Sequence, residues 1–370
     1  MLIAETAAGA VAADITEFSN SVALAQIEYA FSDTTASDIT ASTSAASQGL
    51  ELYISGRFAE AIDAWKSELR TAGDDALYQA AILNYLSLAY QELNQWDLAQ
   101  ETIEESIALL ETHDAVDSLL WAQTLNTQAA LAYHLGQPET ALELWEQSEE
   151  RYRLGTDADG VLGSQINQAQ ALQSLGFYRR SRQQLEAVAQ QLADMPDSAL
   201  KVNGLRTLGN ALQVLGDLSA SRAALFESAN VAIAINATGE LSATYLSLGR
   251  TARDWGDLNA SMAMFERAKQ TALNPSHSLQ ADLSRLRFYV EQQDNTNSAR
   301  VAEGVVAQLA DLPPSRLSVY GTVNMSASLA KEAQLGQSVP IETINELLAQ
   351  AVQAARALED KQAEAYSMGG

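Results

Sequence analysis

The sequence predicts an all-α fold, a solenoid of about eight stacked helix pairs. The first observation is a short turn that returns at steps of 38, 42, 40, 40 and 40 residues, at Gly56-Arg57-Phe58, Asn94-Gln95-Trp96, Gly136-Gln137-Pro138, Gly176-Phe177-Tyr178, Gly216-Asp217-Leu218 and Gly256-Asp257-Leu258. The second is that apolar residues flanking each turn recur at three- and four-residue steps, which indicates α-helices. A fixed period in this range is typical of one supersecondary unit stacked on copies of itself.

Residues 75–112 illustrate the unit. Before the turn, one helical face carries Ile82, Leu86 and Tyr90, and after it Ile103 and Leu110 continue a second face. Neither helix could bury its apolar stripe alone, so neighbouring pairs must stack to form a continuous core.

The turn residues and the acids that follow them suit a helix–turn–helix. Gly or Asn closes a helix at little cost because it can adopt the left-handed conformation. Asp97, Glu139, Asp217 and Asp257 come next, near the start of the second helix, where the helix dipole favours a negative charge.

Both ends of the chain depart from the period. Residues 1–47 predict a largely flexible N-terminal tail, because residues 32–47 are dense in Ser, Thr, Ala and Asp. Two further pairs are expected at 277–310, around Asp294-Asn295, and at 315–358, with a longer turn from Gly336 to Pro340. Residues 365–369 resemble the opening of another first helix, so we expect the 48–370 solenoid to be truncated within a further repeat.

The unit resembles the tetratricopeptide repeat (TPR), whose signature is W-x2-L-G-x2-Y followed by A-x3-F across the turn. Three segments carry it: Leu83-x2-Leu86-Ser87-x2-Tyr90 with Ala99-x3-Ile103, Tyr245-x2-Leu248-Gly249-x2-Ala252 with Ser261-x3-Phe265, and Leu205-x2-Leu208-Gly209-x2-Leu212 with Ser221-x3-Leu225. The resemblance implies a right-handed superhelix with small residues where helices approach closely. The period of about 40 departs from the standard 34.

The chain is strongly acidic, with 22 Lys and Arg against 47 Asp and Glu, a net charge of −25. This opposes binding to nucleic-acid phosphates or anionic lipid. Residues 51–155 hold 19 acids and 5 bases, whereas 156–300 hold 14 and 13. The acidic part either keeps a long open surface soluble or docks a basic partner.

The sequence offers no chemistry for catalysis or for a cofactor. Cys is absent, which excludes a thiol nucleophile or thiolate metal site within this sequence, and no phosphate-binding glycine loop occurs. The segment Gly155 to Gly160 lacks the downstream acid of a calcium loop and predicts an inter-repeat turn.

Glutamates that cluster on single helices are expected to form a solvated face. No apolar stretch is long enough to span a membrane and no convincing secretory signal occurs, so the expected location is cytoplasmic.

A stripe of amides and arginines on the first helices is the candidate binding site. The TPR resemblance implies that these positions are exposed on a concave face: Asn84, Gln91, Asn126, Tyr133, Gln170, Gln173, Arg206, Asn210, Gln213, Arg250 and Arg253. Arg and amide groups suit a peptide carboxylate or an extended backbone. The alternative is that they are simply solvated polar residues.

Two stretches resemble a narrower family. Residues 163–176, followed by Tyr178-Arg179-Arg180, and residues 204–212 are similar to the N-terminal repeats of cyanobacterial proteins that end in a CHAT domain, a caspase-like cysteine peptidase module. The resemblance covers roughly residues 48–370 and implies only the sensor or scaffold half, because the catalytic His–Cys pair has no counterpart here.

The resulting hypothesis is a non-catalytic scaffold that binds a peptide or protein, including a C-terminal module of the same polypeptide. The alternative is a free-standing adaptor in a signalling or secretion assembly. Enzymatic activity of the solenoid itself is the third and weakest hypothesis.

Overall fold

The structure is a computed structural model and describes residues 45–112, 118–273, 275–335 and 341–369. Within these ranges the chain forms helices and no strand, which confirms the predicted all-α fold. Of the expected tail at residues 1–47, residues 1–44 lie outside the described residues, and the helix α2 begins at Ala45. The expected Gly336–Pro340 turn also lies outside them.

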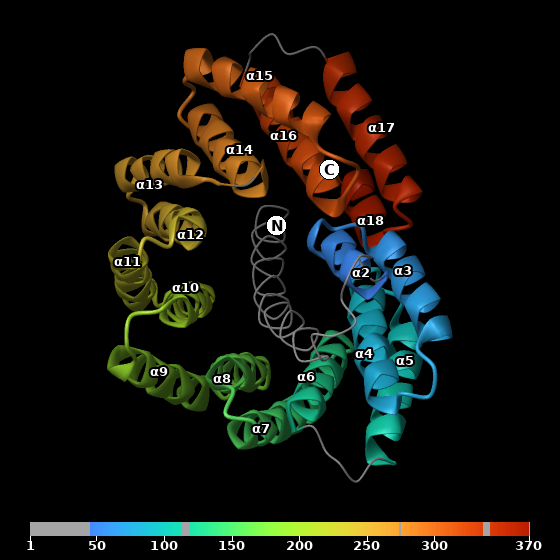
Figure 1. The fold of residues 1–370 in the computed structure, drawn as a ribbon. Coiled ribbons are helices and arrows are strands. Elements are labelled where there is room, and N and C mark those ends of the chain that lie inside the picture. The colour runs from blue at the N-terminus through green and yellow to red at the C-terminus, as the bar shows by residue number, and fades with distance from the viewer. Residues whose placement is uncertain (1–44, 113–117, 274, 336–340, 370) are drawn as a thin grey trace. The chain divides into compact units, whose positions relative to one another are not determined.

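The chain divides into two compact units, with the boundary inside the helix α10 (Ala199–Val214), whose residues from Asn210 onward belong to the first unit. The first unit holds four helix pairs (Figure 1): α2 (Ala45–Ile54) with α3 (Phe58–Thr71), α4 (Ala76–Glu92) with α5 (Trp96–Glu111), α6 (Ser118–His134) with α7 (Pro138–Leu154), and α8 (Ala158–Ser174) with α9 (Tyr178–Asp194). Each helix packs on the next, and the first helices α4, α6 and α8 also contact one another in sequence.

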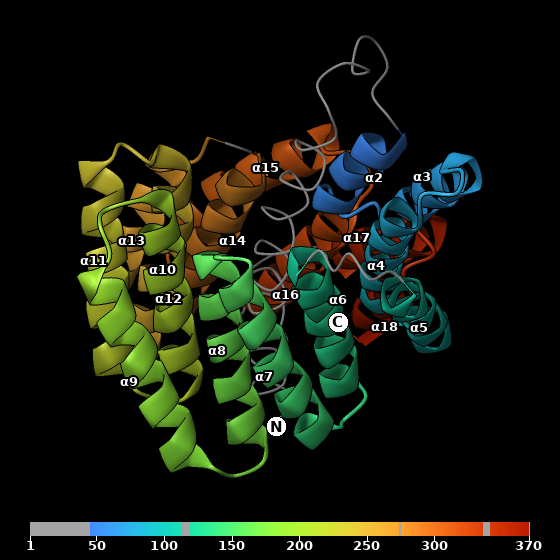
Figure 2. The ribbon, with the colours of Figure 1, turned by 60° about the horizontal axis from the view of Figure 1, so that its bottom comes forward.

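The second unit holds most of α10 and the remaining helices: α11 (Leu218–Ala234), α12 (Thr238–Trp255), α13 (Leu258–Thr271), α14 (Pro275–Glu291), α15 (Asn295–Asp311), α16 (Arg316–Gln334), α17 (Ile341–Ala357) and α18 (Lys361–Gly369). The first helices α12, α14 and α16 contact one another in order (Figure 2), as in the first unit. Helix α18 follows the last complete pair and packs on α16 and α17.

The turn prediction is confirmed at the backbone. Gly56, Gly136, Gly176, Gly216 and Gly256 have φ between 74° and 86°, and Asn94 has φ 56°. Asp217 and Asp257 cap α11 and α13 by accepting from the backbone N–H groups of Ala220 and Ala260. The turn expected around Asp294-Asn295 is shifted slightly: Gln293 is the left-handed residue, with φ 57°, and Asp294 caps α15.

In three of the pairs, a glycine of the first helix faces a large side chain of the second helix that stands sixteen positions later in the sequence. A Cβ at Gly49 would overlap Trp65, one at Gly209 would overlap Leu225, and one at Gly249 would overlap Phe265. The three large side chains are at most 1% exposed. Glycine at these positions therefore sets how closely the helices of a pair approach, as the TPR resemblance implies.

Buried serines tie three second helices, α5, α7 and α11, to the first helices of their pairs. The hydroxyls of three serines each donate a 2.8 Å hydrogen bond to the backbone carbonyl of the residue twenty-six positions earlier, on the first helix: Ser106 to Ala80, Ser148 to Ala122 and Ser228 to Val202. Each hydroxyl would be costly to bury without a partner, so the repeated bond fixes the register of the pair.

Candidate functional site

All eleven stripe residues lie on first helices, at three levels of the repeat counted back from the left-handed turn residue. Asn84, Asn126 and Arg206 stand ten residues before it, Gln170, Asn210 and Arg250 stand six before it, and Gln91, Tyr133, Gln173, Gln213 and Arg253 stand three before it. The expectation that they are all exposed is wrong for four of them, since Asn84, Gln91, Asn126 and Asn210 are buried.

Amides of the first unit hold neighbouring repeats together. The Oδ1 of Asn126 accepts from the indole Nε1 of Trp145 at 3.0 Å and from the Nδ2 of Asn167 at 3.4 Å. The Nε2 of Gln91 donates to the backbone carbonyl of Thr127 at 3.3 Å. These side chains are buried because the next first helix packs over them, so their polar atoms are engaged inside the protein.

Four other first-unit members of the stripe, Tyr133, Gln170, Gln173 and Gln213, are only half-buried. The hydroxyl of Tyr133 lies 2.7 Å from that of Ser174, one repeat further on. Gln170, Gln173 and Gln213 keep part of their surface accessible. In this unit the accessible part of the stripe is therefore neutral and rich in amides.

In the second unit the stripe becomes basic. Arg250 and Arg253 stand one turn apart on α12, both half-buried, and Arg206 is half-buried on α10. The Nε of Arg253 lies 3.6 Å from the Asp254 carboxylate, and its side chain is 26% exposed. Burial lowers the pKa of Arg253, and the positive charges of Arg287 and Arg250 lower it further, whereas Asp254 and Glu291 oppose the shift.

Sequence reasoning missed Arg287, on α14. This residue stands six positions before the left-handed Gln293, which is the level that Arg250 occupies before Gly256. The TPR signature is weak in α14, and the sequence places the turn after this helix at Asp294-Asn295, one residue later than the left-handed Gln293. The stripe is therefore not extended to α14 from the sequence. Counting back from Gln293 would have found it. We call the set of four arginines on these first helices the arginine face: Arg206, Arg250, Arg253 and Arg287.

Acidic groups and one histidine adjoin the arginine face. Arg287 pairs with Glu291 at 2.9 Å, and both side chains are more than a third exposed. Burial and the charge of Arg206 lower the pKa of His277, while Glu240 opposes that shift. His277 is therefore neutral at pH 7, and the positive charge of this surface comes from the guanidinium groups.

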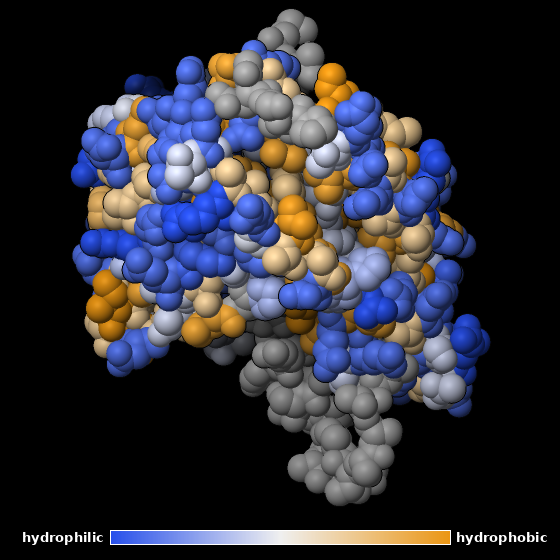
Figure 3. Space-filling model, turned by 90° about the horizontal axis from the view of Figure 1, so that it is seen from above, coloured by the Kyte–Doolittle hydropathy of each residue, from blue (hydrophilic) through white to orange (hydrophobic). Residues whose placement is uncertain are grey.

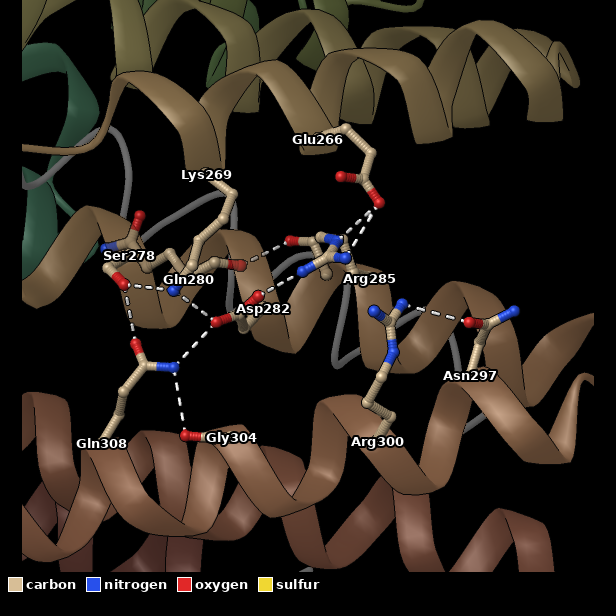
Figure 4. Close-up of polar contacts among 11 residues, drawn as sticks. Glu266, Lys269, Ser278, Gln280, Asp282, Arg285, Asn297, Arg300, Gly304 and Gln308 are labelled. Carbon is tan, nitrogen blue, oxygen red and sulfur yellow. Dashed lines mark hydrogen bonds and ion pairs between the residues drawn. The ribbon is translucent and has the colours of Figure 1, made fainter.

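A second polar cluster of this unit serves structure (Figure 4). The buried Asp282 carboxylate accepts from Lys269 at 2.6 Å, Arg285 at 2.6 Å and the amide of Gln308 at 2.7 Å, which joins α13, α14 and α15. Arg285 also binds Glu266 at 2.9 Å. Both Asp282 oxygens are satisfied by protein donors, so the cluster stabilises the packing of these helices and offers no free ligand group.

Other site types find no support in the described part of the chain. Among those residues no three His, Asp or Glu side chains come together as a metal site would require. No helix in the same ranges is long and apolar enough to cross a membrane. The face shown in Figure 3 carries hydrophobic side chains scattered among hydrophilic ones.

Comparison with known proteins gives a fold and no family. No family model and no curated protein matches the sequence. The apo form of the quorum sensor NprR from B. thuringiensis is 11% identical, with a TM-score of 0.51, over 94% of this chain and 99% of NprR. The apo form of RapI is 12% identical with a TM-score of 0.47, over 75% of this chain and 98% of RapI. A putative kinesin light chain of Podospora anserina with nearly identical TPR-like repeats is 18% identical with a TM-score of 0.42, over 51% of this chain and 94% of the other.

The likeness to NprR extends over nearly the whole of both chains and agrees with the helix pairs, turns and close contacts described above. The fold is therefore a TPR-like α-solenoid.

Proposed function

We propose that this chain is a non-catalytic interaction scaffold whose arginine face binds an acidic segment or the C-terminal carboxylate of a protein. The observation that carries the proposal is the recurrence of guanidinium groups on the successive first helices α10, α12 and α14 of the second unit. Those of α12 and α14 lie close together, since Arg287 and Arg250 add to the effect of burial in lowering the pKa of Arg253. Mutual repulsion of this kind is relieved when an anion binds among the charges.

The chemistry of guanidinium suits carboxylate. Its planar donors match the two carboxylate oxygens, and a charge-assisted hydrogen bond contributes roughly 1.5–3 kcal/mol where water is excluded. The competing acids at this surface form exposed ion pairs, which contribute little: Asp254 lies 3.6 Å from Arg253 and is 39% exposed, and Glu291 pairs with Arg287 at 2.9 Å and is 36% exposed. An incoming carboxylate can therefore displace them at little cost.

In the first unit the half-buried amides of Gln170, Gln173 and Gln213 are the proposed contacts for a peptide backbone. The buried Asn84, Gln91, Asn126 and Asn210 are assigned to structure, because burial leaves their side chains almost no surface for a ligand. The proposed binding set is thus narrower than the stripe expected from the sequence.

Two settings for such a scaffold follow from the sequence. The resemblance to CHAT-domain proteins favours a regulatory region whose partner is a C-terminal module of the same polypeptide. The alternative is a free-standing adaptor in a signalling or secretion assembly. A Cys- and His-bearing domain downstream in the same reading frame supports the first setting, and a stop codon there supports the second.

The binding proposal is tested by capture of partners on purified protein. The triple variant Arg206→Ala, Arg250→Ala, Arg253→Ala removes three charges of the arginine face. The matched control, Arg222→Ala, Arg267→Ala, Arg300→Ala, removes three charges from the second helices α11, α13 and α15. We expect the first variant to lose partners that the wild type and the control retain. Equal retention by all three proteins would refute the arginine face as the binding surface.

A further inference from the structure

A cleft on the first unit lies where α5, α6 and α7 meet, and none of the stripe residues lines it. Its volume is about 360 Å³, and it is lined by Trp96, Asp97, Gln100, Gln128, Ala132, Leu135, Gln137, Thr140 and Leu144. This size lies at the lower end of the range for small-ligand sites and suits one or two peptide side chains.

The cleft has an apolar wall and a polar rim. Ala132, Leu135 and Leu144 supply aliphatic surface, and the Trp96 ring is stacked at 5.9 Å on His134. Burial lowers the pKa of His134, so the imidazole brings no positive charge at pH 7. Leu135 is 40% exposed, a large apolar side chain that an incoming apolar group would cover.

The helices on either side of the cleft are acidic. Helix α5 contains no Lys or Arg, and its acids are Asp97, Glu101, Glu104, Glu105 and Glu111. On α7 the acids are Glu139, Glu143, Glu146, Glu149 and Glu150, and its two bases, Arg151 and Arg153, stand in the last turn.

These charges face the solvent near the cleft. Gln100, in its lining, donates to Glu104, and Glu143 follows the lining residue Thr140 by one helical turn. Asp97, Glu101, Glu104, Glu139 and Glu143 all keep solvent-accessible surface. At the far end of α7, Arg151 lies over the ring of Trp121 and Arg153 pairs with Glu149. The part of α7 next to the cleft is therefore acidic alone.

We propose that this cleft docks a basic segment of a partner protein, with one apolar side chain against Trp96, Leu135 and Leu144 and Lys or Arg residues beside Asp97, Glu101 and Glu143. An apolar anchor between charged flanks is a common arrangement at peptide-binding surfaces. The surface differs from the arginine face in charge and lies in the other unit, so it takes a different segment. The scaffold thereby joins a basic partner to an acidic one.

The probe is a short blocked peptide with two central leucines flanked by Lys and Arg, labelled for fluorescence anisotropy and titrated with the full chain. We expect binding that weakens as salt rises towards about 0.15 M, because exposed charges are screened. Binding should be lost when the leucines are replaced by serine or the basic residues by glutamate. No binding of the basic peptide, or equal binding of the three peptides, would overturn the proposal.

Variants locate the site. Asp97→Asn with Glu101→Gln and Glu143→Gln should weaken binding at least about tenfold, since three facing charges are removed together. Thr140→Trp, at an exposed lining position, should block the cleft without disturbing the core. The matched control, Glu51→Gln, Asp63→Asn, Glu186→Gln, neutralises three exposed acids of α2, α3 and α9 and should bind as the wild type does. Equal weakening by the control would show diffuse attraction and overturn the proposal.

Two further measurements distinguish the cleft from the arginine face and from a self-association surface. The arginine-face triple variant should bind the basic peptide unchanged, so failure of that face leaves this result intact. If sedimentation shows a dimer that Thr140→Trp dissociates, the cleft is occupied by a second copy and the proposed basic partner is wrong.

Discussion

Replacing Gly249 with Ala tests the close approach of paired helices. Gly249 lies inside α12, opposite Phe265 of α13. An added Cβ would lie 2.5 Å from the Cδ1 and 3.0 Å from the Cζ of the Phe265 ring, which is only 1% exposed. Because the ring has no free space to enter, the backbones of the pair must separate.

Two opposing terms set the size of the effect. Alanine in a helix interior is favoured over glycine by about 1 kcal/mol. Forcing an extra methyl into a packed core costs about 1–3 kcal/mol, and this overlap with a buried ring belongs at the upper end. We therefore expect Gly249→Ala to lower the free energy of unfolding by about 2 kcal/mol.

The control is Gly304→Ala, an exposed position inside α15 where an added Cβ would meet nothing within 4 Å. There only the helix propensity acts, so the free energy of unfolding should rise by up to about 1 kcal/mol. Urea unfolding followed by circular dichroism measures both variants. Adding Phe265→Leu to Gly249→Ala should recover part of the loss, seen as a favourable coupling in the double-mutant cycle. If Gly249→Ala stabilises the protein as Gly304→Ala does, the close packing is wrong.

Two other predictions concern polar groups. Burial and the neighbouring Asp157 carboxylate raise the pKa of Asp159 to about 6, so its ionised form destabilises the fold above that pH and the penalty vanishes below the unfolded pKa near 4. Asp159→Asn should therefore raise the free energy of unfolding at pH 7 by about 1 kcal/mol, a value reduced because the side chain is partly exposed, and should leave it unchanged at pH 3.5. Urea titrations at the two pH values measure the difference, and an equal effect at both would contradict the prediction. Asn126→Ala leaves the buried Trp145 indole without its 3.0 Å acceptor and should lower the free energy of unfolding by about 1–3 kcal/mol. The control Asn324→Ala removes the exposed acceptor of the Tyr366 hydroxyl and should lower it by less than about 1 kcal/mol in the same assay. Equal losses would argue against a stabilising role of the buried bond.

The repeat could be predicted because its determinants are local. A Gly or Asn at a fixed period, apolar residues at three- and four-residue steps and an acid at the next helix start are all visible in one sequence. They placed the described turns at Gly56 through Gly256 correctly. They failed at Gln293, because a residue without a turn preference adopts the left-handed conformation there.

The candidate site was harder to predict because exposure depends on how successive repeats stack. Asn126 and Gln91 look like groove residues by position, yet the following first helix covers them. The same stacking sets Arg287 near Arg253, a neighbour that spacing within one helix cannot show. The cleft beside Trp96 depends on three helices at once, so the sequence offered only its acidic flanks.

The central claim is tested most directly by titrating a captured acidic partner segment into three proteins by calorimetry: the wild type, the arginine-face triple variant and the second-helix triple control. At about 1.5 kcal/mol or more for each arginine engaged, loss of even two should lower affinity by at least about 100-fold. The control should stay within about twofold of the wild type, because its charges lie on second helices, outside the face. If the two triple variants lose affinity equally, the attraction comes from overall charge, and the arginine face is not the binding site.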